Sequence, residues 1–479
     1  MIRQFERKQN QMIKYCKFDN SLTKSPGTRF WMVLLVLYGI CLLNYCYNDL
    51  QMIVRHSLNI WYQIENGSIL QFYQTGYQLP IGDLNQVVGE VPYDFGLYIP
   101  IAIWNFPIYI WEKISGVTFD GSFIALLWTR VGLLIPFAGC NGVLWKIGEH
   151  LKKGKIGKTW LCFLFSSSMF LINGLFCIGQ IDIINTFFTL MGLWAYLRKD
   201  KKKFIIWFML AITCKMFALM IFLPLLILWE KRILYIIKNT LQALTITLIT
   251  KIIFFHDKMQ TPTTFDEKRF SLFLFERQID LSNISVSVFI LMFACLMIWC
   301  WNQKCNDSKW EYYAVWTAFA GYACFFCGAT TYPYWTVVFS PFVPLLIVLF
   351  PDKSKILLWL ETIAAALYFV KGMCDYGWIY SAEKNVSWML AGIMNDRALR
   401  GIDFRWQYLN LSELTRQNLQ SIFISGFWGA IAGILVMTYP AKGKVDENVL
   451  EVDRGSVWCR LFINASLAVF PLLCYLLFD

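Results

Sequence analysis

The chain has 479 residues, of which 57% are hydrophobic, 18% aromatic and only 16% charged. Soluble domains carry about 25% charged residues, so this composition excludes an ordinary soluble protein. The net charge of +11 does not indicate nucleic-acid binding, because the basic residues cluster in short runs between apolar segments, as in the cytoplasmic loops of membrane proteins.

Mostly apolar segments of about 20 residues, the length that crosses a bilayer, recur along the whole chain. They predict an all-α polytopic membrane protein with about 11 to 13 transmembrane helices. Residues 1–29 are basic and polar without a cleavable signal peptide, so they are predicted to be a cytoplasmic segment. The apolar segments begin near Phe30, Leu97, Phe123, Leu161, Ile183, Phe204, Ile233, Val286, Tyr312, Val337, Ile356, Ile422 and Val457.

The first apolar segment is followed directly by Asp49 and an amphipathic pattern. Apolar residues from Leu50 onward fall on one helical face, and polar residues such as Arg55 and Asn59 fall mainly on the other. This pattern predicts a helix lying in the membrane interface, within an outer loop at 48–96. Asp49 at its start either caps the helix or has a functional role.

The same outer loop carries further carboxylates. Asp83, Glu90 and Asp94 lie among several tyrosines. Carboxylates beside aromatic rings suit sugar hydroxyls and ring faces, but a tyrosine-rich interfacial belt is an equally good interpretation. Glu90 and Asp94 are therefore candidates for binding a sugar or an acceptor.

The stretch GQIDIIN places Gln180 and Asp182 at the boundary of a span. The flanking basic runs KKGKIGK and RKDKKK are expected inside, so both residues are expected on the same outer face as Asp49. Lys215 lies within an apolar run, where a lysine needs a partner or water. Its partner is either Asp182 or an anionic ligand such as a phosphate, with Arg277 as a second cation.

The basic runs RKDKKK and EKR both look cytoplasmic, although only the apolar segment 204–229 separates them. Two short helices that turn at Lys215 would resolve this conflict, because broken helices are tolerated in membranes where they line a cavity. A similar conflict affects 97–145, which contains Arg130.

The later part of the chain offers aromatic and charged candidates. ATTYPYW contains Tyr334 and Trp335, and both could bind a sugar. The loop 375–421 carries Asp and Arg residues that either bind an anionic head group or are simply solvated. The chain is predicted to divide into a catalytic module at 30–350 and a C-terminal transmembrane region at 351–479.

Two stretches resemble the GT-C glycosyltransferases, which include the protein O-mannosyltransferases and the dolichol- and polyprenol-dependent sugar transferases. GQIDIINTFFTLMGLWAYLRKDKKKFIIWFMLAITCKMFALMIFLPLL is similar to a pattern in which a G-Q-x-D/N turn precedes a span, a basic loop and a lysine before a proline-containing helix. TYPYWTVVFSPFVPLL is similar to the late P-Y-W turn of bacterial relatives. The resemblance covers roughly residues 30–350.

This resemblance implies an inverting hexosyltransferase. Its donor is a polyprenyl-phosphate-linked sugar, and its acceptor is a lipid-linked or glycan hydroxyl. Asp49 is then the catalytic base, and Lys215, with Arg277 or Arg55, holds the lipid phosphate. Asp182 orients Lys215 or binds the sugar. No cofactor is expected, and the outer loop lacks the D-x-D pair that would support a divalent metal.

Two other functions stay open. A flippase for lipid-linked sugars explains the intramembrane charges equally well, although the chain contains no inverted repeat. An O-antigen-type polymerase or ligase usually carries its large loop late, as 375–421 allows. The richness in Lys, Ile and Phe favours a bacterial plasma membrane, with membrane lipids around the protein and the active site on the extracytoplasmic face.

Overall fold

The computed structural model describes residues 25–45, 48–78, 91, 93–118, 123–256, 274–282, 284–304, 309–375, 412–440 and 450–478. The predicted cytoplasmic segment 1–29 and the predicted loop 375–421 fall largely outside the described residues, and Asp83 and Glu90 fall outside them entirely. Within the described part, regular structure is almost all helical, and its strands form one antiparallel pair. The predicted all-α polytopic membrane fold is confirmed.

The longer helices are α2 (Thr28–Asn44), α3 (Asn48–Glu65), α4 (Phe72–Gln78), α5 (Phe95–Ser115), α6 (Phe123–His150), α7 (Lys155–Ser166), α9 (Asp182–Leu197), α10 (Lys201–Cys214), α11 (Leu219–Trp229), α12 (Ile233–Ala243), α13 (Thr245–Ile253), α15 (Val288–Asn302), α16 (Trp310–Gly328), α17 (Phe342–Leu349), α18 (Ser354–Asp375), α20 (Glu413–Met437) and α21 (Arg454–Phe478). Short turns connect them: η1 (Ile69–Gln71), α8 (Met169–Leu171), η3 (Ile172–Ile178), η4 (Met216–Ala218), η6 (Pro333–Phe339) and η7 (Pro351–Lys353). Strands β1 (Gln278–Leu281) and β2 (Ile284–Ser287) pair with Gln278 opposite Ser287.

Several predicted spans are divided by breaks. Among the described residues, three helices are long and apolar enough to cross a bilayer: Ile124–His150, Pro351–Met373 and Gln417–Met437. Two more spans result if each bent helix pair, α7 with α8–η3 (44°) and α12 with α13 (51°), counts as one. Other apolar helices are shorter than a span. Broken helices of this kind need polar groups that satisfy the freed backbone.

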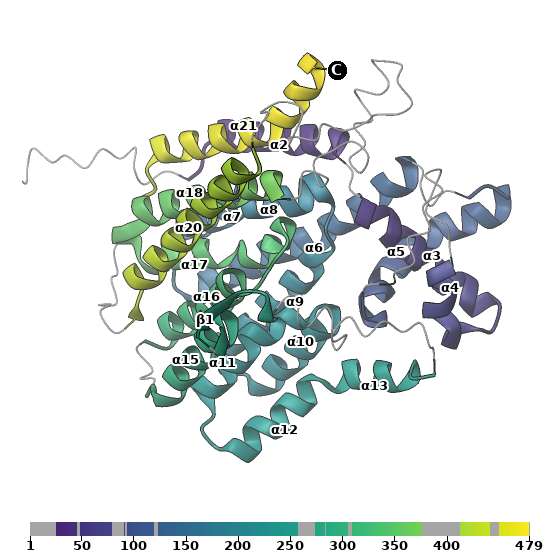
Figure 1. The fold of residues 1–479 in the computed structure, drawn as a ribbon, viewed down its shortest axis with the longest axis horizontal. Coiled ribbons are helices and arrows are strands. Elements are labelled where there is room, and N and C mark those ends of the chain that lie inside the picture. The colour runs from purple at the N-terminus through teal and green to yellow at the C-terminus, as the bar shows by residue number, and fades with distance from the viewer. Residues whose placement is uncertain are drawn as a thin grey trace, which may run out of the picture.

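One large hydrophobic core joins helices from both ends of the chain. It contains buried residues from Phe30 on α2 to Ala468 on α21, and these two helices lie side by side (Figure 1). Helices α3, α4 and α5 form a lobe at one side of this bundle, and α12 and α13 run along its edge toward that lobe (Figure 1). The candidate site lies where the lobe meets the bundle.

The segment 204–229 is a helical hairpin. Lys215 adopts an extended conformation (φ −160°, ψ 126°) that ends α10, and η4 and α11 follow. The chain then returns, because Lys201 at the start of α10 pairs with Glu230 after α11 at 3.1 Å. Phe204 also stacks on Phe222, with ring centroids 5.2 Å apart. The predicted turn at Lys215 is confirmed, and RKDKKK and EKR lie at the same end of the hairpin.

Single cysteines placed in these two basic runs are therefore expected to react from the same side of a membrane. Lys202→Cys and Arg232→Cys both replace exposed residues. In sealed vesicles, an impermeant maleimide should label both variants from one side, above the labelling of the wild-type protein. Asn66→Cys, beyond the end of α3, is expected to react from the opposite side. Labelling of the two basic runs from different sides contradicts the hairpin.

Arg130 joins two helix ends. It is buried within α6, and its guanidinium donates hydrogen bonds to the carbonyls of Leu42 and Tyr45 at the end of α2. It also donates to the carbonyls of Phe176 and Cys177 at the end of η3. The last carbonyls of a helix have no partner within the helix, so Arg130 satisfies them at two ends together. The segment 97–145 contains two helices, α5 and α6, as the separate apolar segments near Leu97 and Phe123 predict.

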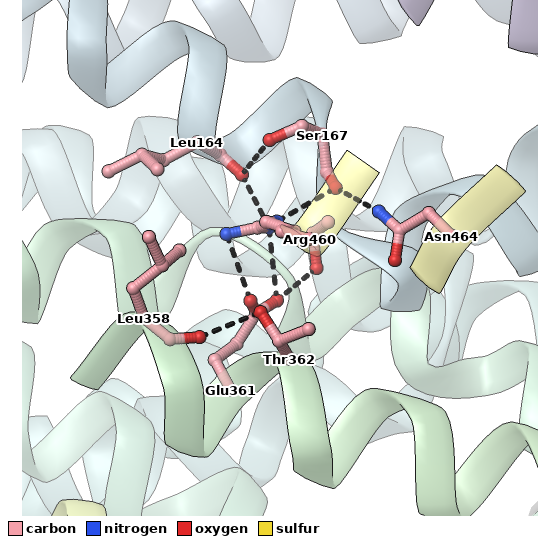
Figure 2. A network of polar contacts seen from close by, with 8 residues as sticks. Leu164, Ser167, Leu358, Glu361, Thr362, Arg460 and Asn464 are labelled. Atoms are coloured by element: carbon pink, nitrogen blue, oxygen red, sulfur yellow. Dashed lines mark hydrogen bonds and ion pairs between the residues drawn. The ribbon is translucent and has the colours of Figure 1, made fainter. Parts of the chain in front are cut away.

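Arg460 likewise satisfies backbone carbonyls, here at the break after α7 (Figure 2). Its Nε donates to the carbonyl of Ser167 at 3.0 Å, and Nη2 donates to that of Leu164 at 2.9 Å. Glu361 on α18 balances the charge, with Oε2 at 3.0 Å from Nη1, and Asn464 donates to the same Ser167 carbonyl. This buried network fastens α21 to α7 and α18.

Candidate functional site

Asp49 lies in the first turn of α3 and faces the bundle. Its Oδ2 accepts a hydrogen bond from Nε2 of Gln180 at 2.9 Å, and its carboxylate also bonds to the hydroxyl of Tyr334. Asp49 is half-buried and lies outside the candidate spans. Burial raises the pKa of Asp49 to about 6, against the lowering effects of Gln180, Tyr334 and the positive charge of Lys215. A carboxyl with such a pKa exchanges its proton near neutral pH.

The GQID stretch is a tight turn between η3 and α9. Gly179 has a positive φ of 79°, which glycine adopts without a steric penalty, and the chain there reverses so that Gln180 faces Asp49. Gly174 on η3 touches the η6 backbone so closely that a Cβ would collide with the carbonyl of Tyr334. Two glycines thus bring Gln180 and Tyr334 to the same carboxylate.

Lys215 and Asp182 form a buried ion pair. The Nζ of Lys215 lies 2.7 Å from Oδ1 and 2.9 Å from Oδ2 of Asp182, and the side chains are 9% and 1% exposed. Asp182 is the first residue of α9, where a carboxylate is favoured by free N–H groups. The sequence left two partners open for Lys215, and in this structure the partner is Asp182.

Aromatic rings surround the ammonium group of Lys215. Its Nζ lies 4.7 Å from the ring centres of both Phe217 and Trp335, and 5.6 Å from that of Tyr93. Such rings attract a cation through their negative faces. Asn185 on α9 holds the hairpin turn itself, because its side-chain amide donates to the carbonyls of Ala211 and Lys215.

A second ion pair flanks this centre. Asp94, the residue before α5, lies 2.5 Å from Nζ of Lys251 on α13. The neighbouring residue Tyr93 is the one whose ring faces Lys215. Sequence reasoning selected Asp94 but missed Lys251. The signal that marked Lys215, a lysine within an apolar run, was also present in LITKIIFF.

Arg277 and Arg55, the two other residues predicted to bind the phosphate, make contacts away from Asp49 and Lys215. Arg277, just before β1, donates to the carbonyl of Cys327 at 2.8 Å, and its guanidinium lies 5.5 Å from the ring centre of Trp428. Arg55 lies further along α3, where its charge acts on Tyr62. The structure therefore brings together Asp49, Gln180, Asp182, Lys215, Tyr334 and Trp335, with Asp94 at the flank.

Helix α3 is enclosed more fully than its pattern predicts. Leu50, Val54 and Leu58 are buried as expected, against α5 and α6. Asn59 and Gln63, expected on a polar exposed face, are also buried, and Asn59 donates to the carbonyl of Phe72. The physical reason is that η1 and α4 fold back over this face and supply hydrogen-bond partners. The helix is a packed element of the lobe and leaves Asp49 in a fixed position.

The geometry supports proton transfer and anion binding. One cluster contains the half-buried carboxylate of Asp49, the buried amide of Gln180 and the ammonium group of Lys215, which aromatic rings surround. These residues lie at helix starts and helix breaks. In the part of the chain that the structure describes, no three His, Cys, Asp or Glu side chains are grouped as a metal site would require.

Fold and cluster define a polytopic membrane protein with a polar centre built at helix breaks. The EpsG family model matches residues 145–387, just over half of the chain, and the chain belongs to the EpsG family. This family is consistent with a membrane glycosyltransferase or an O-antigen-type polymerase-like function. The matched segment includes Gln180, Asp182 and Lys215, whereas Asp49 precedes it. No curated protein matches the chain.

Proposed function

We propose that the protein transfers a hexose from a polyprenyl-phosphate-linked donor to a hydroxyl of a lipid-linked or glycan acceptor, with inversion, on the extracytoplasmic face of a bacterial plasma membrane. The observation that carries this proposal is the carboxylate of Asp49. It is held by Gln180 and Tyr334 next to the buried pair of Lys215 and Asp182. Membership in the EpsG family supports the same class of enzyme.

Asp49 acts as the general base. It removes the proton from the acceptor hydroxyl while the hydroxyl oxygen forms a bond to the anomeric carbon of the donor sugar. The bond between that carbon and the phosphate oxygen breaks at the same time, and the lipid phosphate leaves with the electron pair. Gln180 and Tyr334 fix the orientation of the carboxylate through their hydrogen bonds.

Lys215 stabilises the departing phosphate. An ammonium group has three N–H donors, and the two oxygens of Asp182 accept at most two of them. The remaining donor can reach a phosphate oxygen without separation of the buried pair. The rings of Trp335 and Phe217 limit access of water to this charge, which strengthens its effect on the leaving group.

An O-antigen-type polymerase is the second candidate, because membership in the EpsG family is consistent with that function as well. In that case donor and acceptor are both lipid-linked glycans. The base and the cation keep the same roles, because a hydroxyl still attacks an anomeric carbon and a lipid phosphate still leaves.

The first test is consumption of donor by the purified full-length protein in nanodiscs. Polyprenyl-phosphate hexoses are supplied together with crude lipid and glycan acceptors. Lipid-linked oligosaccharides, which can serve as both donor and acceptor, are supplied in a separate reaction, and release of the lipid carrier is followed in each. Release from the monosaccharide donors supports the transferase, and release only from lipid-linked oligosaccharides supports the polymerase. Movement of labelled donor across a vesicle membrane without any release would instead establish a flippase.

The rate of transfer is expected to rise with pH and to level off above a pH of about 6. Burial raises the pKa of Asp49 to about 6, so its carboxyl is protonated at lower pH and cannot accept the hydroxyl proton. The pH profile of kcat/KM for the wild-type protein measures this directly. A profile that stays flat down to a pH of about 4, where an ordinary carboxyl titrates, contradicts the assignment of Asp49 as the base.

A further inference from the structure

Lys251 is a cation placed where the surroundings are unfavourable for it. It lies in the last turn of α13, a helix of otherwise mostly apolar residues, and is 17% exposed. Its ion-pair partner Asp94 is 7% exposed. Taking both charges out of water costs more than their attraction returns unless the geometry is excellent. Ionisable residues retained within membrane segments generally mark substrate pathways.

The pair borders the proposed active site. Asp94 directly follows Tyr93, whose ring lies 5.6 Å from Nζ of Lys215. On the other side, Thr247, one turn before Lys251, lies 3.4 Å from Thr213 of α10, two residues before Lys215. Lys215 at the break after α10 and Lys251 in the last turn of α13 thus both border this region.

The outer side of α13 faces away from the site and is apolar. Leu248, Ile249, Ile252 and Ile253 are all exposed large hydrophobic residues, as are several residues of α12. In a membrane, such a surface contacts acyl or prenyl chains. Lys251 therefore lies on a helix whose outer face is suited to lipid, and its ion pair with Asp94 places it on the side of that helix nearer the polar centre.

The side chain of Asp94 has alternative hydrogen-bond partners at the start of α5. It occupies the N-cap position of α5, yet its side chain makes no capping hydrogen bond there while it is paired with Lys251. The first N–H groups of a helix favour a carboxylate, both as hydrogen-bond donors and through the helix dipole. A rotation of its side chain would give Asp94 these partners and would release the ammonium group.

We propose that Lys251 is a second phosphate-binding residue and that its ion pair with Asp94 is exchangeable. When a polyprenyl phosphate arrives along α13, Lys251 moves from the carboxylate of Asp94 to the phosphate, and Asp94 moves to cap α5. This inference rests on the proposed function for the nature of the lipid. It adds to Lys215 a second residue that binds the phosphate, and it describes how the lipid phosphate enters the site.

Direct binding of polyprenyl phosphate to the full-length protein in nanodiscs tests this, with uncharged polyprenol as the comparison. Lys251→Gln is expected to weaken binding of polyprenyl phosphate about tenfold, because it removes a charge-assisted contact, and to leave polyprenol binding unchanged. Asp94→Asn is expected to tighten phosphate binding several-fold, because the competing carboxylate charge is gone. Inorganic phosphate at the same concentration is expected not to displace the lipid.

A matched control is the exposed pair of Lys113 and Glu65, 2.5 Å apart on α5 and α3. Lys113→Gln and Glu65→Gln are expected to change neither affinity. If Lys251→Gln and Asp94→Asn both weaken phosphate and polyprenol binding equally, the pair only holds helices together and the proposal is wrong. Displacement by inorganic phosphate would also overturn it, because the site would then not require the lipid.

The binding assay involves no sugar transfer, so the two proposals fail separately. Absence of transfer with every donor, together with the expected change in Lys251→Gln, rejects the transferase and keeps the phosphate site. Transfer by the wild-type protein with unaltered phosphate binding in Lys251→Gln rejects the phosphate site alone.

Discussion

Asp49→Asn is expected to remove sugar transfer and to make the protein more stable at the same time. Loss of a general base lowers kcat/KM by about 10²–10⁴-fold. The variant keeps a planar side chain of the same size, so Gln180 and Tyr334 can remain in place. Release of the lipid carrier by purified wild-type and variant protein at pH 7.5 measures the loss.

The gain in stability follows from the cost of the buried charge. Burial raises the pKa of Asp49 to about 6, so the folded state disfavours the ionised form. The penalty is absent below a pH of about 4, where the carboxyl is protonated whether folded or unfolded, and it is complete above about 6. A neutral Asn avoids this penalty, which is on the order of 3 kcal/mol at pH 7.5. Thermal unfolding in nanodiscs should show a higher Tm for the variant at pH 7.5 and no difference at a pH of about 3.

Asp352→Asn is the matched control, because Asp352 is exposed on η7, outside the candidate site. It is expected to change neither transfer nor Tm. Full transfer by Asp49→Asn would reject Asp49 as the base. Loss of transfer together with a lowered Tm at pH 7.5 would mean that Asp49 supports the fold instead of costing stability.

Lys215→Met is expected to have the opposite effect on stability. It leaves the carboxylate of Asp182, which is 1% exposed, without its cation. Removing one partner of a buried ion pair costs about 3–5 kcal/mol, because the other charge stays buried without compensation. The free energy of unfolding in a mild detergent, measured by denaturant titration, quantifies the loss. Lys158→Met, which breaks the more exposed pair with Glu149, is expected to cost about 1 kcal/mol or less.

A double variant separates the structural from the catalytic contribution of Lys215. Lys215→Met combined with Asp182→Leu removes both charges, and apolar replacements of a buried pair are often neutral for stability. The double variant is expected to fold nearly as well as the wild-type protein and still to lack transfer. Recovery of transfer along with folding would show that the pair serves the fold alone.

Local patterns were enough to predict the membrane fold and the parts of the site that depend on chain position. The alternation of basic runs and apolar segments predicted that Asp49 and Asp182 lie on the same face of the membrane, and the structure places both in one cluster. The conflict between two neighbouring basic runs predicted the hairpin at Lys215. In each case the information lies within a few dozen residues.

Pairings across long stretches of chain could not be predicted in this way. Arg460 and Glu361 are 99 positions apart, and Arg130 reaches carbonyls 85 to 88 positions earlier in the sequence. An apolar segment with one charge indicates that a partner exists, but its identity depends on the packing of helices. Arg277 shows the same limitation, because it was expected beside Lys215 and instead caps the end of α16 through the carbonyl of Cys327.

The network around Arg460 has a consequence for biosynthesis. Arg460 is made 293 residues after Ser167, whose carbonyl it satisfies. At about 5–20 residues per second, Arg460 is therefore synthesised roughly 15 to 60 seconds after the break that follows α7. Until then the carbonyl of Leu164 has the hydroxyl of Ser167 as its local partner, and the carbonyl of Ser167 depends on water, lipid head groups or the insertion machinery. We expect a stop codon before α21 to leave a protein that inserts into the membrane but is degraded by quality control.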